Sequence, residues 1–482
     1  MELSDLQQQI KSASKWSSIT EIVARLIAPI TNMILARLLV PEAFGIATTV
    51  LMIVSFAEMF SDAGFQKFLI QREFTTKKEL YQNANVAFWT SISITILAAI
   101  LICVFSEQIS SMLGNPGLGN VICFASIQLP LYTFASIQMA LYKRSFDFKT
   151  LFKARFFYAV IPLFITVPLA YIGLSYWALI IGSICGVLSN ALYLTIKSEW
   201  KPSLFFKIAV LKSMFSFSMW TLMESISIWF TAWIDVFIIG TYLSAYYLGI
   251  YKVSVTTVGV ILAIITSATS PIMFSSLSRM QDNQEQFNKF YFFMQKAVAY
   301  LVFPAGVGIY IYSDTITNIL LGDKWGEASI IIGLWGLVSV VMVVFSFYSS
   351  DVFRAKGAPK LSVISQMLHL LFLVPTCIIS VKYGFWPLIY ARTFIRLQAV
   401  IVSILLLQYI FKISFLETLN NVYKPILCSI AMGLIGLWLK TVNSGMAWDI
   451  ISICLSTLFY FGLLFIFARK DILLIYNQFI KK

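Results

Sequence analysis

The stretch that decides the fold of this chain is apolar over the length of a membrane span. Residues 328–350 read ASIIIGLWGLVSVVMVVFSFYSS and contain no charged residue. A helix needs about 20 consecutive apolar residues to cross a bilayer, so this stretch predicts a transmembrane helix. Similar runs predict fourteen such helices and an all-α, polytopic membrane protein. They lie near residues 16–39, 43–60, 84–106, 119–142, 156–173, 176–196, 214–240, 246–272, 291–312, 327–350, 361–381, 385–411, 425–440 and 447–468.

The composition supports this prediction. Of the 482 residues, 59% are hydrophobic and 12% are charged. A soluble protein carries about 25% charged residues, so this chain cannot cover a water-exposed surface. The six cysteines lie in apolar runs without CxxC spacing or a histidine partner. We therefore expect them to be small core residues, and neither disulfides nor zinc ligands.

Basic residues alternate between the two sides of the predicted membrane. With the N-terminus in the cytoplasm, 26 of the 35 lysines and arginines fall in the tails and the inner loops. The opposite side holds only Lys324, Lys382 and Lys440, and six lie within or at the edge of spans. Cytoplasmic loops are enriched in Lys and Arg, so an even number of spans with both termini in the cytoplasm is predicted. This distribution also accounts for the net charge of +13, and no nucleic-acid partner is expected.

The chain contains a weak internal repeat. An offset of 204 residues lays Gly45 on Gly249. A second match, at an offset of 211, lays Gly173 on Gly384. Repeats with an even number of spans share one orientation, a transporter arrangement with the substrate site between the halves. The predicted parts are an N-lobe of helices 1–6 at residues 1–200, a C-lobe of helices 7–12 at 201–412, and two additional helices at 413–482.

Several short motifs resemble a known family. They are LARLLVPEAFG at 35–45, DAG at 62–64, LIQR at 69–72, KRSF at 143–146, LGDKW at 321–325 and FRAKG at 353–357. Over almost its whole length the chain resembles the Wzx-type polysaccharide flippases of the multidrug/oligosaccharidyl-lipid/polysaccharide exporter superfamily. The colanic-acid and teichuronic-acid export branch is the most similar.

This resemblance implies twelve plus two helices and a flippase, not an enzyme. Its substrate would be an oligosaccharide on undecaprenyl diphosphate, moved by alternating access from the inner to the outer leaflet of the bacterial inner membrane for exopolysaccharide or O-antigen-type assembly. The expected partners are this lipid-linked oligosaccharide and the lipid bilayer, with polysaccharide polymerase machinery as a further candidate. The chain is expected to act as a monomer. Neither a cofactor nor a metal is expected, and the ATP-binding pattern GxxxxGK[ST] does not occur in the sequence.

Ionisable residues inside the spans are the candidate functional residues, because a charge at the centre of a span costs at least about 2.5–3.5 kcal/mol. The candidates for binding diphosphate and sugar are Arg25, Asn32, Lys252, Arg392 and Arg396. The candidates for ion coupling or charge pairing are Glu21, Glu58, Asp62, Glu224 and Asp235. A cleft with arginine and lysine at mid-depth would neutralise the anionic head group while it crosses.

A structural role for the same charges is an open alternative. Counted from the outer turns, Arg25 is level with Glu58. Asp235 is level with Lys252 in the same way. Two buried ion pairs would then merely hold helices together. Lys296 is expected to snorkel at the inner end of its span.

Arg392 and Arg396 lie one turn apart near the middle of a span. Two like charges at that spacing repel, and an anion between them would relieve the repulsion. Pairing with an acid from another helix, or snorkelling, fits the sequence equally well. Glu58 and Asp62 have the same spacing and suit Na⁺ or H⁺ coupling or a static pair with Arg25.

Two other classes of function remain open. Cation-coupled drug or small-molecule antiport within the same superfamily would favour an acidic cleft, which the basic spans and the motifs disfavour. A membrane glycan polymerase or ligase would need a sizeable outer loop with acid and base residues. The longest predicted outer loop runs only from Ser313 to Gly326 and contains no histidine.

Overall fold

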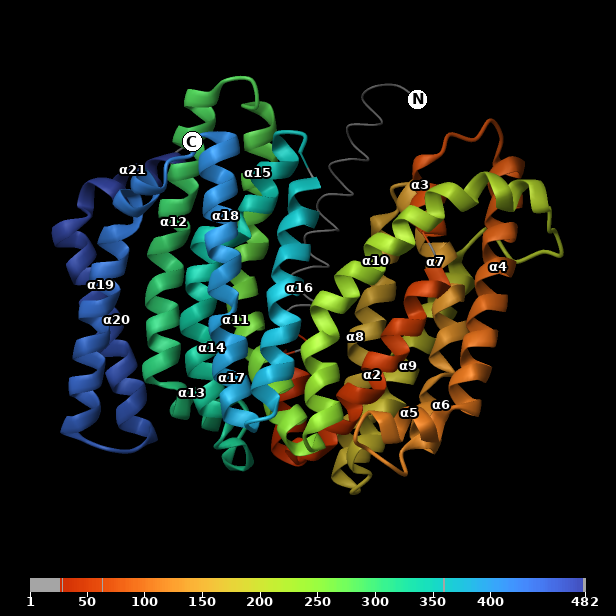
Figure 1. Cartoon of the computed structure of the whole chain (residues 1–482), viewed down its shortest axis with the longest axis horizontal. Coiled ribbons are helices and arrows are strands. Elements are labelled where there is room, and N and C mark those ends of the chain that lie inside the picture. The colour runs from red at the N-terminus through yellow and green to blue at the C-terminus, as the bar shows by residue number, and fades with distance from the viewer. Residues whose placement is uncertain (1–26, 28, 63, 359, 480–482) are drawn as a thin grey trace. The chain divides into compact units, whose positions relative to one another are not determined.

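The computed structural model describes residues 27, 29–62, 64–358 and 360–479, without the side chains of 61–62, 215–221, 224 and 475–479. Throughout this part of the chain the regular structure is helical, with no strand (Figure 1). Thirteen apolar segments there are long enough to cross a membrane, and they correspond to predicted spans two to fourteen. The protein is therefore an all-α, multi-pass membrane protein. The first predicted span lies largely outside the described residues, so the count of fourteen stays a prediction.

The helices form two compact units, the first ending at Lys252 and the second beginning at Val253. The first unit contains α2 (Pro41–Asp62), α3 (Phe65–Gln71), α4 (Lys77–Val104), α5 (Ser106–Met112), α6 (Gly119–Ala125), α7 (Gln128–Arg144), α8 (Phe148–Tyr171), α9 (Ser175–Lys197), α10 (Ile208–Tyr242) and the start of α11 (Ala245–Arg279). The second contains the rest of α11, then α12 (Gln284–Ile311), α13 (Ser313–Leu320), η1 (Asp323–Trp325), α14 (Ala328–Met342), η2 (Val343–Phe347), α15 (Ser349–Ala355), α16 (Lys360–Val381), α17 (Phe385–Phe394), α18 (Arg396–Phe411), α19 (Phe415–Val442), α20 (Met446–Phe467) and α21 (Arg469–Phe479). The lobe boundaries at residues 200 and 412 stay a prediction.

Each unit has its own apolar interior. In the first unit α8 packs along α9, and α7 lies against α4 and α9. Phe88 and Trp200 belong to one buried cluster there. In the second unit α12 packs against α14 and α19, and α19 packs against α20, around Met432 and Tyr460. Large apolar side chains such as Phe164 and Leu458 face outward, as expected of helices that contact lipid.

Three of the spans are built from more than one helical piece. The apolar stretch at residues 328–350 lies in one of them. There α14 ends at Met342 and continues as the π-helix η2 before α15. Gln295 of α12 is buried and donates its amide to the carbonyl of Val344, at 3.1 Å, within this π-turn. Single π-turns are rare in helices overall, but those that occur are often at functional sites. In another such span, α17 gives way to α18 at Ile395.

The repeat match at Gly45 and Gly249 corresponds to a close backbone contact. A Cβ on Gly45 would overlap the carbonyl of Ala245, and a Cβ on Gly249 would overlap the carbonyl of Pro41. The offset of 204 residues relates Pro41 to Ala245 as well, so the contact is reciprocal, as in a two-fold interface. Because only glycine lacks a Cβ, no other residue fits at these two positions.

The second repeat match has a glycine with positive φ at both positions. Gly173, which follows α8, has φ 95°, and Gly384, which follows α16, has φ 106°. Positive φ is readily adopted only by glycine. The two matching turns therefore each contain a glycine with positive φ just after a helix.

Two of the short motifs meet in the first unit. Arg144 donates from Nη1 to the carbonyls of Leu69, Ile70 and Arg72, at 3.0, 3.1 and 2.6 Å. These carbonyls lie at the C-terminal end of α3, where backbone acceptors lack helical partners and an arginine is favourable. The motif at 143–146 therefore caps the helix that contains the motif at 69–72.

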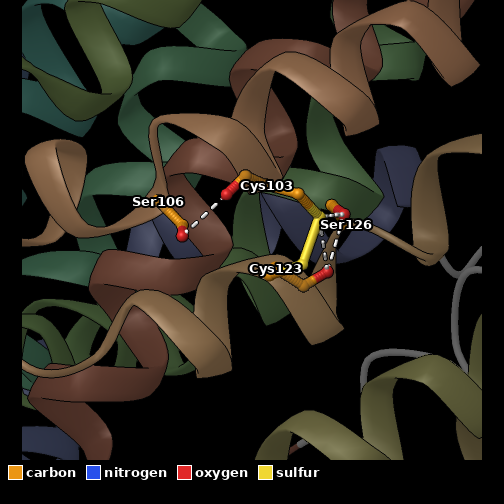
Figure 2. The surroundings of a disulfide bond; sticks show 4 residues. All are labelled: Cys103, Ser106, Cys123 and Ser126. Atoms are coloured by element: carbon orange, nitrogen blue, oxygen red, sulfur yellow. Dashed lines mark hydrogen bonds between the residues drawn. A yellow bond between two sulfur atoms is a disulfide. The ribbon is translucent and has the colours of Figure 1, made fainter.

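The cysteine prediction is wrong for one pair. Cys103, near the end of α4, and Cys123, in α6, form a disulfide with Cα atoms 4.5 Å apart (Figure 2). The hydroxyls of Ser106 and Ser126 donate to the carbonyls of Cys103 and Cys123, at 2.9 and 2.7 Å. The prediction relied on CxxC spacing, whereas a helical hairpin places residues opposite each other that are 20 apart in sequence. The other four cysteines are thiols.

Candidate functional site

Two clusters of described residues bring intramembrane charges together with aromatic rings, one in each unit. The Asp235 cluster consists of Trp233 and Asp235 on α10 with Tyr251 and Lys252 on α11. The arginine cluster consists of Trp335 and Ser339 on α14, Arg392 on α17 and Arg396 on α18. Each cluster is built from helices of a single unit.

In the Asp235 cluster, the carboxylate is buried, at 6% exposure. Its Oδ2 accepts a hydrogen bond of 2.5 Å from the Tyr251 hydroxyl, and its Oδ1 accepts one of 2.8 Å from the backbone N–H of Val236. The ammonium of Lys252 lies 4.2 Å from the centre of the Trp233 ring. Asp235 and Lys252 thus belong to one cluster, and an ion pair between them stays a prediction. The side-chain hydrogen bond to Asp235 Oδ2 comes from Tyr251, the residue before Lys252.

The arginine cluster brings two guanidinium groups to one indole ring. The Cζ atom of Arg392 lies 5.2 Å from the centre of the Trp335 ring, and that of Arg396 lies 4.2 Å from it. Arg396 also donates from Nη1 to the Ser339 hydroxyl, at 2.8 Å. Arg392 is 9% exposed and Trp335 is 6% exposed. The two arginines, which the sequence places one turn apart, thus both contact the ring of Trp335.

Local structure explains this convergence. Trp335 lies two turns into α14, and Arg392 lies two turns into α17. Ser339 follows Trp335 by one turn and so lies on the same helical face. Arg396 lies just beyond the change from α17 to α18, one turn deeper than Arg392. Two adjacent spans therefore present an aromatic face and two cations at matching depth.

The electrostatics of the arginine cluster favour an anion. An indole face attracts a cation by about 0.5–2 kcal/mol, which offsets part of the cost of burying each guanidinium. Two guanidiniums on one ring still repel each other. Guanidinium groups bind phosphate oxygens through paired N–H donors, and a diphosphate has oxygens for both arginines. The arrangement suits a phosphate-bearing head group.

Glu58 lies in a different setting within the first unit. It is half-buried on α2, and its charge acts on the hydroxyls of Tyr132 and Tyr158, which hydrogen-bond to each other. These tyrosines come from α7 and α8. Glu58 is thus placed among polar groups of its own unit, and its predicted level pairing with Arg25 is not tested.

Other predicted residues lie at or beyond the limits of the description. Glu21 and Arg25 are outside the described residues, and so are the side chains of Asp62 and Glu224. Asn32 is half-buried in the helical segment 29–38. Their roles stay predictions.

Lys296 forms an ion pair with α21, and its predicted snorkelling stays a prediction. Its ammonium lies 3.2 Å from Asp471 Oδ1 on α21, and Lys424 lies 2.9 Å from Oδ2 of the same carboxylate. The Tyr300 hydroxyl donates to Oδ2 at 3.2 Å. These contacts join α21 to α12 and α19.

Sequence reasoning missed the aromatic and hydroxyl groups of both clusters. Trp233, Trp335 and Tyr251 look like ordinary apolar residues of a membrane span. Their one available signal is position, since Tyr251 adjoins Lys252, and Trp233 and Asp235 lie two residues apart. An intramembrane cation predicts an aromatic or acidic neighbour, but the sequence does not say which one.

Comparisons with known proteins agree with this architecture. A family model described as "Polysaccharide biosynthesis protein" matches residues 34–330. The chain is 24% identical over 473 residues to the teichuronic acid biosynthesis protein TuaB of Bacillus subtilis (strain 168), covering 95% of this chain and 96% of that protein. It is 21% identical over 381 residues to the lipopolysaccharide biosynthesis protein WzxC of Escherichia coli (strain K12), covering 78% and 76%. Among solved structures, the lipid II flippase MurJ in an inward closed conformation shares the fold, with a TM-score of 0.76 at 16% identity over 94% of this chain and 99% of that one.

Proposed function

Because the chain belongs to the polysaccharide biosynthesis protein family, we propose that it is a flippase for a polyprenyl-diphosphate-linked oligosaccharide. The lipid-linked repeat unit crosses from the inner to the outer leaflet of the bacterial inner membrane by alternating access. The chain acts as a transporter and not as an enzyme. The relatives named for teichuronic acid and lipopolysaccharide biosynthesis support an exported glycan as the end product.

The observation that carries this proposal is the arginine cluster. Arg392 and Arg396 are held inside a membrane span with both guanidiniums on the Trp335 ring. A static scaffold gains little from two like charges at one point, because burying each of them is costly. A diphosphate that passes through the membrane needs cations at mid-depth. We assign Arg392 and Arg396 to the binding of this group, with sugar contacts left to uncharged polar side chains such as Asn32.

Lys252 and Asp235 have a different proposed role. Lys252 supplies a point charge for the head group, and the nearby carboxylate of Asp235 keeps that charge inside the membrane when no substrate is bound. Glu58, Asp62, Glu224 and Glu21 are the remaining candidates for ion coupling. Both termini are proposed to be cytoplasmic, since 26 of the 35 basic residues fall on that side. The polymerase machinery is a proposed neighbour, and the functional state is proposed to be a monomer.

A reconstituted flipping assay tests the proposal. Purified protein is placed in vesicles with a fluorescent polyprenyl-diphosphate oligosaccharide, and its appearance in the opposite leaflet is measured. The double variant Arg392→Ala/Arg396→Ala should lose flipping, because both phosphate contacts are removed. The matched control is Arg469→Ala, since this arginine also stacks on an aromatic ring, Phe465, but at the start of α21 outside the spans.

Two outcomes would overturn the proposal. One is full flipping by the double variant at normal protein levels, which would remove the arginines from the substrate path. The other is uptake of a fluorescent organic cation by vesicles that do not flip the lipid-linked oligosaccharide. That result would favour drug or cation antiport instead.

A further inference from the structure

The hairpin between α4 and α7 is held together at its tip by a covalent bond. The tip consists of the short helices α5 and α6, each of seven residues, and the turn between them. Helices of this length are not stable alone. The disulfide between Cys103 and Cys123 joins the end of α4 to α6 across this turn, as Figure 2 shows.

The charge pattern of this hairpin places its tip on the outer side. Residues 105–118 contain no lysine or arginine. The opposite ends carry Lys77 and Lys78 at the start of α4 and Lys143 and Arg144 at the end of α7. Basic residues favour the cytoplasmic side, so the disulfide lies toward the outer face. Disulfides form and persist in oxidising compartments outside the cytoplasm and are rare within it.

Polar contacts arrange the same tip. The carboxylate of Glu107 accepts hydrogen bonds from the backbone N–H groups of Gly117 and Gly119, at 2.7 and 3.3 Å. The Ser110 hydroxyl bonds to the carbonyl of Asn115. These contacts set the turn, whereas the disulfide fixes the turn to α4.

The tip forms one wall of an apolar cavity in the first unit. Ile109, Met112 and Leu113 of the tip line this cavity of about 540 Å³, and Trp229 and Ile234 of α10 face them. Helix α2 contributes the neighbouring wall. The tip also touches the end of α10, because a Cβ on Gly114 would overlap the carbonyl of Gly240. The position of the tip therefore affects the shape of this cavity and the packing against the end of α10.

From these observations we infer that Cys103 and Cys123 form a site of thiol oxidation on the outer face, and that the bond fixes the wall of the α2–α10 cavity. The two thiols lose two electrons and two protons to the disulfide of a thiol–disulfide oxidoreductase, which leaves as a dithiol. This inference does not depend on the identity of the transported substrate. It adds a maturation step to the folding of the protein.

Counting thiols in intact cells tests the oxidation. Cells are grown anaerobically and quenched with acid, and the unfolded protein is labelled with a maleimide polymer that shifts its mass once per thiol. Four of the six cysteines should react without reductant and six after reduction. The same count in a host without its periplasmic thiol oxidase should give six before reduction. Six reactive thiols in the normal host would overturn the disulfide, and four in the oxidase-free host would overturn its formation on the outer face.

Serine variants test the role of the bond. Cys103→Ser/Cys123→Ser should lower the apparent unfolding temperature by roughly 3–8 °C, because a cross-link of this kind constrains the unfolded chain. Reduced wild-type protein should show the same shift. The matched control Cys185→Ser/Cys454→Ser changes two thiols and should leave the unfolding temperature of the oxidised protein unchanged. Equal unfolding temperatures for oxidised, reduced and double-serine protein would overturn the structural role.

Discussion

The Asp235 cluster and the arginine cluster differ in the groups that surround their intramembrane cations. Both rest a cation on a tryptophan ring, at 4.2 Å for Lys252 and at 4.2 and 5.2 Å for the two arginines. The four side chains that define the Asp235 cluster sum to zero charge, whereas those of the arginine cluster sum to two positive charges. The first cluster is balanced within itself. The second concentrates positive charge on one ring, which makes it the more informative place to look for an anionic substrate.

The largest expected effect comes from the arginine cluster. Arg396→Ala removes a guanidinium that can make charge-assisted hydrogen bonds to phosphate, each contributing about 1.5–3 kcal/mol. Flipping by the variant should therefore fall by roughly ten-fold or more. Arg392→Ala should act in the same direction, and the double variant should be worse than either single one. The readout is the initial flipping rate in vesicles at equal protein density. A double variant that recovers flipping would show that the two arginines serve only to balance each other.

The Asp235 cluster distinguishes substrate binding by Lys252 from a purely structural pair. Breaking a buried ion pair typically costs about 3–5 kcal/mol, and here Asp235 is buried and Lys252 is half-buried. Lys252→Ala and Asp235→Ala should each impair folding and export. If the pair is structural, the double variant should be milder than both single variants. A glycan-export complementation assay with membrane levels checked measures this cycle. Recovery in the double variant would exclude Lys252 from substrate binding and leave the phosphate to the arginine cluster.

A smaller effect is expected from the hydroxyl that serves Asp235. Tyr251→Phe removes the hydrogen bond of 2.5 Å to the buried carboxylate. Leaving such a group without this donor should cost about 1–3 kcal/mol and lower the apparent unfolding temperature. Tyr242→Phe is the matched control, because this tyrosine is exposed at the end of α10, the helix that contains Asp235. An unchanged unfolding temperature for Tyr251→Phe would show that the carboxylate does not depend on this bond.

The aromatic supports offer a direct comparison of the two clusters. Trp335→Leu removes the ring beneath two guanidiniums, and Trp233→Leu removes the ring beneath one ammonium. At about 0.5–2 kcal/mol for each cation, the first change should weaken substrate binding more than the second. Trp335→Phe should restore part of the effect, because a smaller aromatic face remains. The readout is the substrate concentration at half-maximal flipping. Equal effects of Trp335→Leu and Trp335→Phe would indicate a loss of packing and not of the cation contact.

The fold was predictable because hydropathy and loop charge act directly on the bilayer. The predicted span 447–468 corresponds to α20, which runs from Met446 to Phe467. The breaks were not predictable in the same way. No residue between Leu388 and Phe411 is a proline, yet α17 ends before Ile395. The π-turn at Val344 is stabilised by Gln295 of another helix, whose amide donates a hydrogen bond to the carbonyl of Val344. A local sequence pattern does not predict a contact between two helices.

For the candidate site, the sequence predicts the depth of a residue in the membrane but not the direction in which its side chain points. Counting along the helix gives the depth of Asp235 and Lys252 and brings them to one level. Depth does not give rotation about the helix axis, and adjacent residues such as Tyr251 and Lys252 point about 100° apart. It is therefore Tyr251 that donates to the carboxylate. Likewise, two arginines one turn apart suggest a shared partner, but Trp335 comes from another span and has no sequence signal of its own.

The smallest expected effect lies at a third charged group, near the edge of the membrane. Asp471, on α21 outside the spans, has a carboxylate between the ammonium groups of Lys296 and Lys424. Burial alone would raise the pKa of Asp471, but the hydrogen bonds from these lysines outweigh it and hold the pKa below its usual value. A carboxyl whose pKa is lowered by folding adds stability above its unfolded pKa of about 3.9, and this stability is lost as the pH falls toward the folded pKa.

The packing of α21 against α12 and α19 should therefore become less stable on acidification below about pH 4. Asp471→Asn should have the same effect at neutral pH. Because the pair is partly exposed to solvent, the loss should be only about 0.5–1 kcal/mol, well below that at buried Asp235. Amide hydrogen exchange of α21 as a function of pH measures both effects. The matched control is Glu417→Gln, an exposed acid at the start of α19, which should leave the exchange of α21 unchanged. If Asp471→Asn kept the pH dependence of the wild-type protein, another acid would have to anchor this helix, and the contrast between a solvated and a buried carboxylate would fail.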